Sequence, residues 1–205
     1  MSETMKHHPS QSAPSPRRRS LLGVALLLAV AACGKRISSK LHGVDLSSMK
    51  LPGTFHLRDT NGNPRTLEDF RGNVVLLLFG YTRCPDVCPT TLARAAQIKR
   101  LLGDQGKAPK VVFISVDPGR DTPAILEAYT AAFDPTFIGL YGDAQQTAEA
   151  ARSFGAYYRK VPSGNSYTME HSVLDYVIDT KGVVRFALQY EESAEDSAKD
   201  LKLLL

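Results

Sequence analysis

The chain has 205 residues and a net charge of +4, with 25 lysines and arginines against 21 acidic residues. Four of the basic residues and one acid lie within residues 1–32, so the remainder carries 21 basic and 20 acidic residues. This nearly neutral remainder excludes a nucleic-acid-binding domain, whose basic excess would lie on its folded surface. A hydrophobic content of 43% and a charged content of 22% are those of an ordinary globular protein.

Residues 1–32 are predicted to be an export signal. A polar segment that ends in three arginines, Arg17 to Arg19, precedes twelve apolar or small residues at 21–32. A membrane-spanning helix needs about 20 apolar residues, so this run is short for a span, whereas a basic region before a short apolar run is typical of a secretory signal. Arg18 and Arg19 also resemble a twin-arginine signal, although arginines serve the general export route too.

Cys33 ends the segment Val30-Ala31-Ala32-Cys33, which resembles the lipobox of bacterial lipoproteins. In such proteins the cysteine becomes the first mature residue and its thiol carries a diacylglycerol. Because two or more acyl chains anchor a protein stably, we expect lipidation at Cys33 and an exported, membrane-attached lipoprotein that faces the periplasm or the cell exterior. An uncleaved anchor, or a plain signal with an incidental cysteine, is the alternative. Residues 33–50 are interpreted as a lipid-anchored tether in which His42 is solvated.

Residues 51–205 predict one α/β domain. Asn61-Gly62-Asn63 lies between two short extended segments and indicates an N-terminal β-hairpin. The continuous apolar runs at 74–81 and 111–116 are typical of strands buried on both faces. The remaining expected elements are helices at 89–102, 122–132 (with Asp121 as N-cap), 144–154 and 193–204, and strands at 137–140, 173–178 and 183–188. This order favours an α/β sandwich with parallel central strands.

Cys84 and Cys88 are the two cysteines that remain after Cys33, and they lie where the first buried strand turns into a helix. Backbone N–H groups and the helix dipole favour thiolates at such a position. The pair is interpreted as a dithiol redox centre or a metal site; a structural disulfide is the third possibility, but it would close only a short loop. Thiolates select Cu(I), zinc or iron–sulfur clusters, and an imidazole as third ligand suits copper.

Two histidines, His56 and His171, follow the leader and the tether. His56 lies in the N-terminal hairpin, where a surface or packing role is expected. His171 follows an expected loop rich in Gly, Ser and Asn at 162–167 and opens the strand expected at 173–178. A side chain at the mouth of that strand can reach a neighbouring strand–helix turn, so His171 is the better candidate for a third ligand, although spacing alone leaves both interpretations open.

Three segments resemble the Sco/SenC family: FGYTRCPDVCP at 79–89, ISVDPGRDTP at 114–123, and EHS at 170–172 before a strand that ends in IDTKG. The resemblance runs from about Phe55 to the last helix. It implies a thioredoxin-like fold with an added N-terminal β-hairpin, and a copper-binding protein that serves assembly of the CuA centre of cytochrome c oxidase. The family's copper ligands fall on Cys84, Cys88 and His171. Glu170 stands where the family commonly has Asp, and the lipobox replaces a more common membrane helix.

The resemblance thus implies a metallochaperone that binds one copper, as Cu(I) or Cu(II), and serves the CuA subunit of cytochrome c oxidase, with other periplasmic copper carriers as further partners. The alternative is a membrane-anchored thiol-disulfide reductase, with Cys84 and Cys88 as catalytic residues that reduce the CuA cysteines. A thioredoxin-like reductase normally has a C-x-x-C pair, and a peroxiredoxin is similar in its opening hairpin. Asp117 and Asp121 are expected to end a strand and cap a helix, or to orient the site. A monomer is expected.

Overall fold

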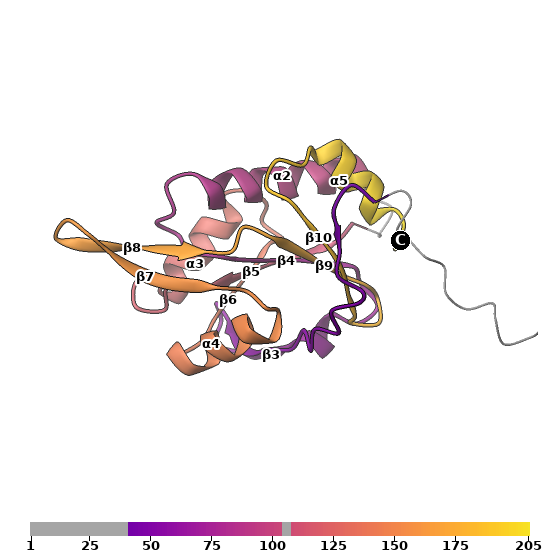
Figure 1. Ribbon diagram of the computed structural model, residues 1–205. Coiled ribbons are helices and arrows are strands. Elements are labelled where there is room, and N and C mark those ends of the chain that lie inside the picture. Colours follow the sequence, from indigo (N-terminus) through magenta and orange to yellow (C-terminus); the bar gives the residue numbers. More distant parts are fainter. Residues whose placement is uncertain (1–40, 104–107) are drawn as a thin grey trace, which may run out of the picture. The chain divides into compact units, whose positions relative to one another are not determined.

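A computed structural model describes residues 41–103 and 108–205 (Figure 1). The expected export signal, the lipidation site Cys33 and the first part of the tether lie outside the described residues. Within those residues no helix is both long and apolar enough to cross a bilayer. The elements follow in the order β1 (Val44–Asp45), β2 (His56–Asp59), β3 (Pro64–Thr66), the 3₁₀ helix η3 (Leu67–Phe70), β4 (Val75–Gly80), α2 (Val87–Leu102), β5 (Lys110–Ser115), α3 (Pro123–Ala131), β6 (Ile138–Tyr141), α4 (Ala144–Ser153), β7 (Tyr158–Ser163), β8 (Ser166–His171), β9 (Asp175–Ile178), β10 (Val184–Leu188) and α5 (Ala194–Leu201).

The described residues form an eight-stranded sheet in the order β1-β10-β9-β4-β5-β6-β2-β3. Its centre, β4, β5 and β6, is parallel, while β9 and β10 form an antiparallel hairpin beside β4 and the β2–β3 hairpin pairs with β6. Every residue of β4 is buried, as its unbroken apolar run predicts for a strand covered on both faces. The expected thioredoxin-like fold with an N-terminal hairpin is confirmed.

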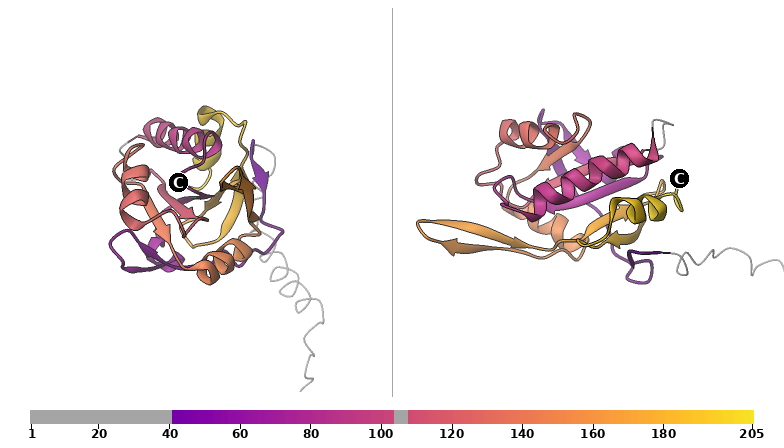
Figure 2. Two further views of the ribbon diagram at one scale, coloured as in Figure 1. Left: turned by 90° about the vertical axis from the view of Figure 1, so that its left-hand side faces the viewer. Right: turned by 90° about the horizontal axis from the view of Figure 1, so that it is seen from above.

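Helices cover the sheet on both faces (Figure 2), and aromatic contacts identify the helix on each face. On one face the ring of Phe113 in β5 packs 5.7 Å from Tyr129 of α3, and α2 lies beside α5. On the other face Phe79 of β4 and Tyr176 of β9 pack against Phe154, which follows α4, at 5.7 and 5.3 Å between ring centroids. The continuous core between these layers holds the strand–helix turns in place.

The segment before His171 differs from the expected loop. Residues 158–171 form the β7–β8 hairpin, a separate two-stranded sheet that turns at Gly164-Asn165. Figure 1 shows this hairpin extending away from the rest of the domain. His171 is therefore the last residue of β8 rather than the start of the following strand. Most side chains of the hairpin are exposed or half-buried, so no apolar run in the sequence marks its strands.

The expected tether, 33–50, overlaps the folded domain. Val44–Asp45 form β1, which pairs with β10 at the sheet edge, and Leu46 is buried in the core. His42 is not a freely solvated residue, because its ring Nδ1 lies 2.9 Å from a carboxylate oxygen of Asp200 in α5. A two-residue strand is too short to show a period, and its partner strand lies far along the chain, which is why the sequence pattern does not reveal it.

The first turn of α3 is capped by Thr122, whose side-chain oxygen accepts a hydrogen bond from the amide of Ile125. The prediction of Asp121 as the N-cap is wrong. Asp121 is buried, and its carboxylate accepts hydrogen bonds from the hydroxyls of Thr82, at 2.6 Å, and Ser115, at 2.6 Å. The carboxylate of Asp121 thus stabilises the turn after β4 and does not cap α3.

Candidate metal centre

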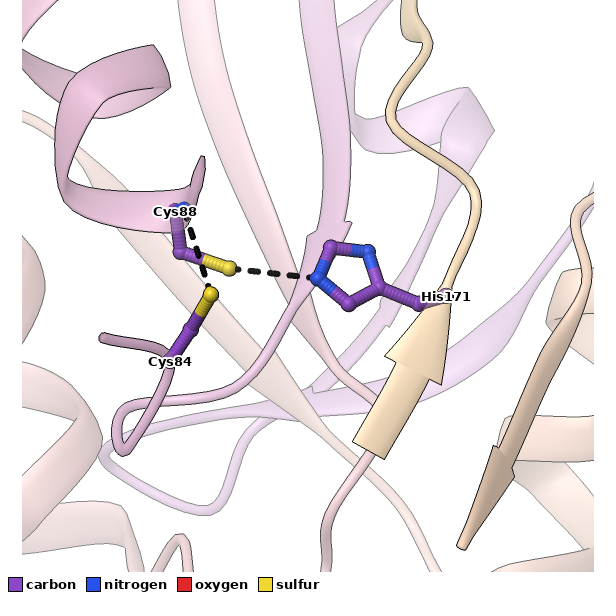
Figure 3. A group of neighbouring side chains, drawn as sticks. All are labelled: Cys84, Cys88 and His171. Atoms are coloured by element: carbon purple, nitrogen blue, oxygen red, sulfur yellow. Dashed lines mark hydrogen bonds between the residues drawn. The ribbon is translucent and has the colours of Figure 1, made fainter. Parts of the chain in front are cut away.

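The turn between β4 and α2 brings the two cysteines together. The amide of Cys84 donates to the carbonyl of Tyr81 at 3.2 Å, and Cys88 lies in the first turn of α2. The N-cap residue of this helix, Asp86, makes no side-chain capping bond. Instead, the amide of Cys88 donates to the Sγ atom of Cys84 at 3.4 Å (Figure 3). A negatively charged sulfur at Cys84 therefore satisfies a helix-terminal amide, and the helix dipole favours it.

His171 reaches this turn from the end of β8. Its Nε2 atom lies 3.5 Å from the Sγ atom of Cys88 (Figure 3), and its Nδ1 donates to the backbone carbonyl of Ser172 at 2.8 Å. That second bond leaves Nε2 as the ring atom that faces the sulfurs, which is the arrangement a metal-binding imidazole needs. The ligand atoms of Cys84, Cys88 and His171 all lie within 4.8 Å of one another.

The two thiols have opposite electrostatic environments. A hydrogen bond from the Cys88 thiol lowers the pKa of Cys84 to about 3, against the effect of burial, with further help from His171 and backbone amides. The same hydrogen bond, burial and the charge on Cys84 raise the pKa of Cys88 far above that of a free thiol. At neutral pH the pair therefore holds one proton, on Cys88, and one thiolate, on the half-buried Cys84. Neither of these two cysteines is in a disulfide bond.

A buried ion pair lies behind the site. Asp175 in β9 is the register partner of Leu78 in β4, so its side chain lies on the same face of the sheet as Gly80, two residues on. Its carboxylate accepts a hydrogen bond from Arg94 of α2 at 2.5 Å, and the same guanidinium donates to the carbonyls of residues 189, 190 and 192. The sequence pattern does not reveal this pair, because two charged residues far apart in the chain carry no local signal of their contact.

Of the residues that the sequence offers as possible ligands, three lie together and His56 lies apart. Within the described part of the chain, Cys84, Cys88 and His171 form the group of possible metal ligands, while His56 is exposed in β2 and takes no part in it. Two thiolates and one imidazole are a soft donor set that fits copper. Because Cys84 is half-buried rather than fully enclosed, an incoming ligand could reach the site from solvent.

Two aromatic residues near the site, Tyr81 and Tyr167, are not among the residues predicted from the sequence. Tyr81 packs edge-on against the ring of His171, with 5.8 Å between centroids, and its hydroxyl lies 2.8 Å from that of Thr168. Tyr167 lies over the loop after β5 and contacts Asp117. Tyr81 belongs to the segment 79–89 that carries the family resemblance, so that motif was the available signal. Tyr167 has no comparable local signal.

Comparison with known proteins places the chain in a family. The SCO1/SenC family model matches residues 45–205. An SCO2-like protein of Rickettsia felis is 35% identical over 168 residues, which are 79% of this chain and 82% of the relative. ScoI of Bradyrhizobium japonicum, solved with copper bound, is 40% identical with a TM-score of 0.69, over 75% of this chain and 98% of that chain.

A more distant structure shares the fold. BsSco, described as a member of the Sco family of cytochrome c oxidase assembly proteins, is 23% identical with a TM-score of 0.59, over 80% of this chain and 95% of that chain. The family match begins at Asp45 in β1, covers every later strand of the sheet and includes all three candidate ligands. This chain belongs to the SCO1/SenC family.

Proposed function

We propose that this protein is a copper metallochaperone that holds one copper ion between Cys84, Cys88 and His171. The observation that carries the proposal is the convergence of two sulfurs and one imidazole nitrogen within 4.8 Å, from a strand–helix turn and a separate hairpin. The donor set is one that copper prefers. The copper-bound structure of the 40% identical ScoI supports the same metal for this chain.

Capture and release follow from the protonation of the two thiols. The Cys84 thiolate binds the incoming ion first, because it is already deprotonated and half-buried. Cys88 must then lose its proton, so we expect binding near pH 7 to release about one proton per copper. Three protein ligands leave copper open to a further donor, so an acceptor thiolate can approach and displace them one at a time.

The acceptor that we propose is the CuA subunit of cytochrome c oxidase. The description of BsSco as belonging to a family of cytochrome c oxidase assembly proteins supports this kind of partner. Other periplasmic copper carriers are the proposed donors or alternative acceptors. We further propose that residues 1–32 direct export and that a lipid on Cys33 holds the domain at the membrane, on the periplasmic or outer side.

A second function, reduction of the CuA cysteines, is favoured by the thiolate and thiol arrangement of the pair. The Cys84 sulfur would attack one sulfur of an acceptor disulfide, and the other acceptor sulfur would leave as a thiolate. Cys88 would then lose its proton and attack Cys84 in the mixed disulfide, which releases the second acceptor thiolate. Two electrons pass to the acceptor and Cys84–Cys88 becomes a disulfide.

Copper titration of the full chain tests the ligand set. In a Cys33→Ser background, only Cys84 and Cys88 supply thiolates. We expect one Cu(I) or Cu(II) per chain, and a loss of affinity of at least about 100-fold in Cys84→Ser, Cys88→Ser and His171→Ala, since each removes a ligand. His56→Ala is the matched control and should bind like the parent. Parent-like binding by His171→Ala would overturn the three-ligand site.

Transfer experiments separate the two functions. The copper-loaded chain is mixed with an apo CuA domain whose cysteines are reduced, and the metal-free dithiol chain with the same domain oxidised. Metallation in the first mixture supports the chaperone, and thiol formation in the second supports the reductase. His171→Ala distinguishes them further, because loss of the imidazole should impair metal transfer far more than disulfide reduction. Membrane association that persists in Cys33→Ser would contradict the proposed lipid anchor.

A further inference from the structure

The position of His171 is not maintained by the main sheet. Among residues 41–103 and 108–205, β7 and β8 pair only with each other, whereas Cys84 and Cys88 are attached to β4 and α2 of the central fold. An isolated two-stranded hairpin is at best marginally stable in water. Side-chain contacts between the hairpin and the domain therefore help the backbone to hold the Nε2 atom of His171 at 3.5 Å from Cys88.

Tyr167 makes three of these contacts with the loop after β5. Its hydroxyl donates to Oδ1 of Asp117 at 2.8 Å, and its backbone carbonyl accepts from Nη1 of Arg120 at 2.8 Å. The guanidinium of Arg120 lies over the tyrosine ring at 3.6 Å from the centroid, and within the hairpin the ammonium of Lys160 in β7 lies 3.7 Å from the same centroid. Arg120 also forms an ion pair with Asp117. A charge-assisted hydrogen bond and stacked cations make this contact strong.

One short loop, residues 116–122 between β5 and α3, contacts both parts of the metal centre. Asp121 accepts hydrogen bonds from the backbone amide and hydroxyl of Thr82, two residues before Cys84. Asp117, four residues earlier, holds the hairpin through Tyr167. Both carboxylates are buried, with 3% of Asp117 and 2% of Asp121 exposed. The loop thus connects the cysteine turn to the histidine hairpin through two fixed carboxylates.

We infer that Tyr167, held by Asp117 and Arg120, is a positioning residue that keeps His171 within ligating distance of Cys84 and Cys88. The metal-bound form of this inference rests on the proposed function, since it concerns the same copper site. Release of Tyr167 leaves the cysteine turn in place, because Asp121 still holds Thr82. It weakens the attachment of the hairpin, which then keeps the contact of Thr168 with Tyr81, so His171 moves away from the cysteines more readily. The copper site then alternates between three protein ligands and two.

Two matched pairs of variants test this role in the full chain with Cys33→Ser. Tyr167→Phe removes only the hydroxyl that donates to Asp117, and Tyr141→Phe removes a hydroxyl that makes none of these contacts. Arg120→Gln removes the stacked guanidinium. Its control, Arg159→Gln, removes an arginine of β7 that pairs with Glu170 on the surface. Near-UV circular dichroism and thermal unfolding confirm that each variant is folded.

The first readout needs no metal. In the apo parent we expect nuclear Overhauser contacts between the rings of Tyr81 and His171, whose centroids are 5.8 Å apart. These contacts should weaken, and hydrogen exchange of the β7–β8 amides should accelerate about tenfold, in Tyr167→Phe and Arg120→Gln but not in the two controls. Unchanged contacts and exchange in both test variants would overturn the inference, whether or not the protein binds copper.

The second readout is the Cu(II) form. We expect the thiolate-to-copper absorption band of Tyr167→Phe to shift toward that of His171→Ala, with copper released about tenfold faster than from the parent. Arg120→Lys, which keeps a cation near Tyr167, should recover part of the effect of Arg120→Gln. A parent-like band and release rate in Tyr167→Phe would contradict the inference. Absence of copper binding by the parent would contradict the proposed function, while the apo readout would still decide the role of Tyr167.

Discussion

The Sγ atom of Cys88 occupies the space that a side chain at Gly80 would need. A Cβ atom at Gly80 would lie 2.6 Å from this sulfur and 2.7 Å from the ring of Phe113. Glycine at the end of β4 therefore allows α2 to place Cys88 directly against the sheet, where the sulfur is buried. The close approach depends on the missing side chain, since the backbone at Gly80 does not have a positive φ.

We expect Gly80→Ala to lower copper affinity by about 10-fold to 100-fold, because the added methyl group displaces a ligand sulfur. The free energy of unfolding should also fall by about 1–3 kcal/mol through overpacking. Gly139→Ala is the matched control, as its Cβ would lie equally close, at 2.6 Å, to Leu126 of α3. Copper titration and urea unfolding measure both quantities. Equal affinity losses in the two variants would argue against displacement of Cys88.

Alkylation by iodoacetamide should show the low pKa of Cys84. Since that pKa is lowered to about 3, the thiolate is fully populated at pH 5–8, and the rate in the metal-free folded protein should be nearly flat. A cysteine with a pKa of about 8.5 would react about tenfold faster with each pH unit over this range. Cys84→Ser should abolish the flat component.

Asp175 should make stability decrease with pH. Burial, opposed by Arg94, raises the pKa of this carboxyl to about 7, so the folded protein binds its proton more tightly than the unfolded chain does. Its contribution to stability is complete below about pH 4 and is lost as the pH rises to about 7. We expect the free energy of unfolding of Asp175→Asn, relative to the parent, to increase by about 2 kcal/mol between pH 5 and 7.5.

Urea unfolding of both proteins at the two pH values gives this difference. Asp45→Asn is a useful control, because a hydrogen bond from Ser47 lowers the pKa of Asp45, so Asp45 stays ionised at both pH values and the stability of that variant relative to the parent should stay constant. A constant difference between Asp175→Asn and the parent would show that Asp175 has an ordinary pKa in the folded protein.

His42 should stabilise the attachment of the N-terminal segment mainly at acidic pH. The amides of His42 and Gly43 and the ring Nδ1 all donate to the buried carboxylate of Asp200 in α5. The hydrogen bond to Asp200, followed by the charges of Asp200 and Asp196, raises the pKa of His42. Its contribution is therefore present below about pH 6.5 and is lost as the pH rises through the raised value.

We expect His42→Gln to destabilise the protein more at pH 5.5 than at pH 8.5, as measured by thermal unfolding. His56→Gln, which changes an exposed histidine of β2, should have little effect at either pH. Limited proteolysis near residue 42 gives an independent measure and should be faster in His42→Gln. An equal effect of His42→Gln at both pH values would contradict a charged contact with Asp200.

The sequence by itself determined the local features of this protein. Continuous apolar runs predicted the buried strands β4 and β5, because burial on both faces leaves no polar alternation. The pair Cys84 and Cys88 could be placed at a strand–helix turn from neighbouring residues alone. The segment 79–89 and the two others identified the family, and with it the candidate ligand His171.

Only the tertiary structure decided which distant side chains meet. His171 is 83 residues from Cys88 and reaches it on a hairpin whose half-exposed strands leave no apolar pattern. Asp121 accepts hydrogen bonds from Thr82 rather than capping α3, and the exposed His42 contacts Asp200 of α5, because long-range hydrogen bonds to buried carboxylates outweigh local capping and linker preferences. A metal centre assembled from a turn and a separate hairpin requires long-range contacts, and local sequence patterns do not specify these.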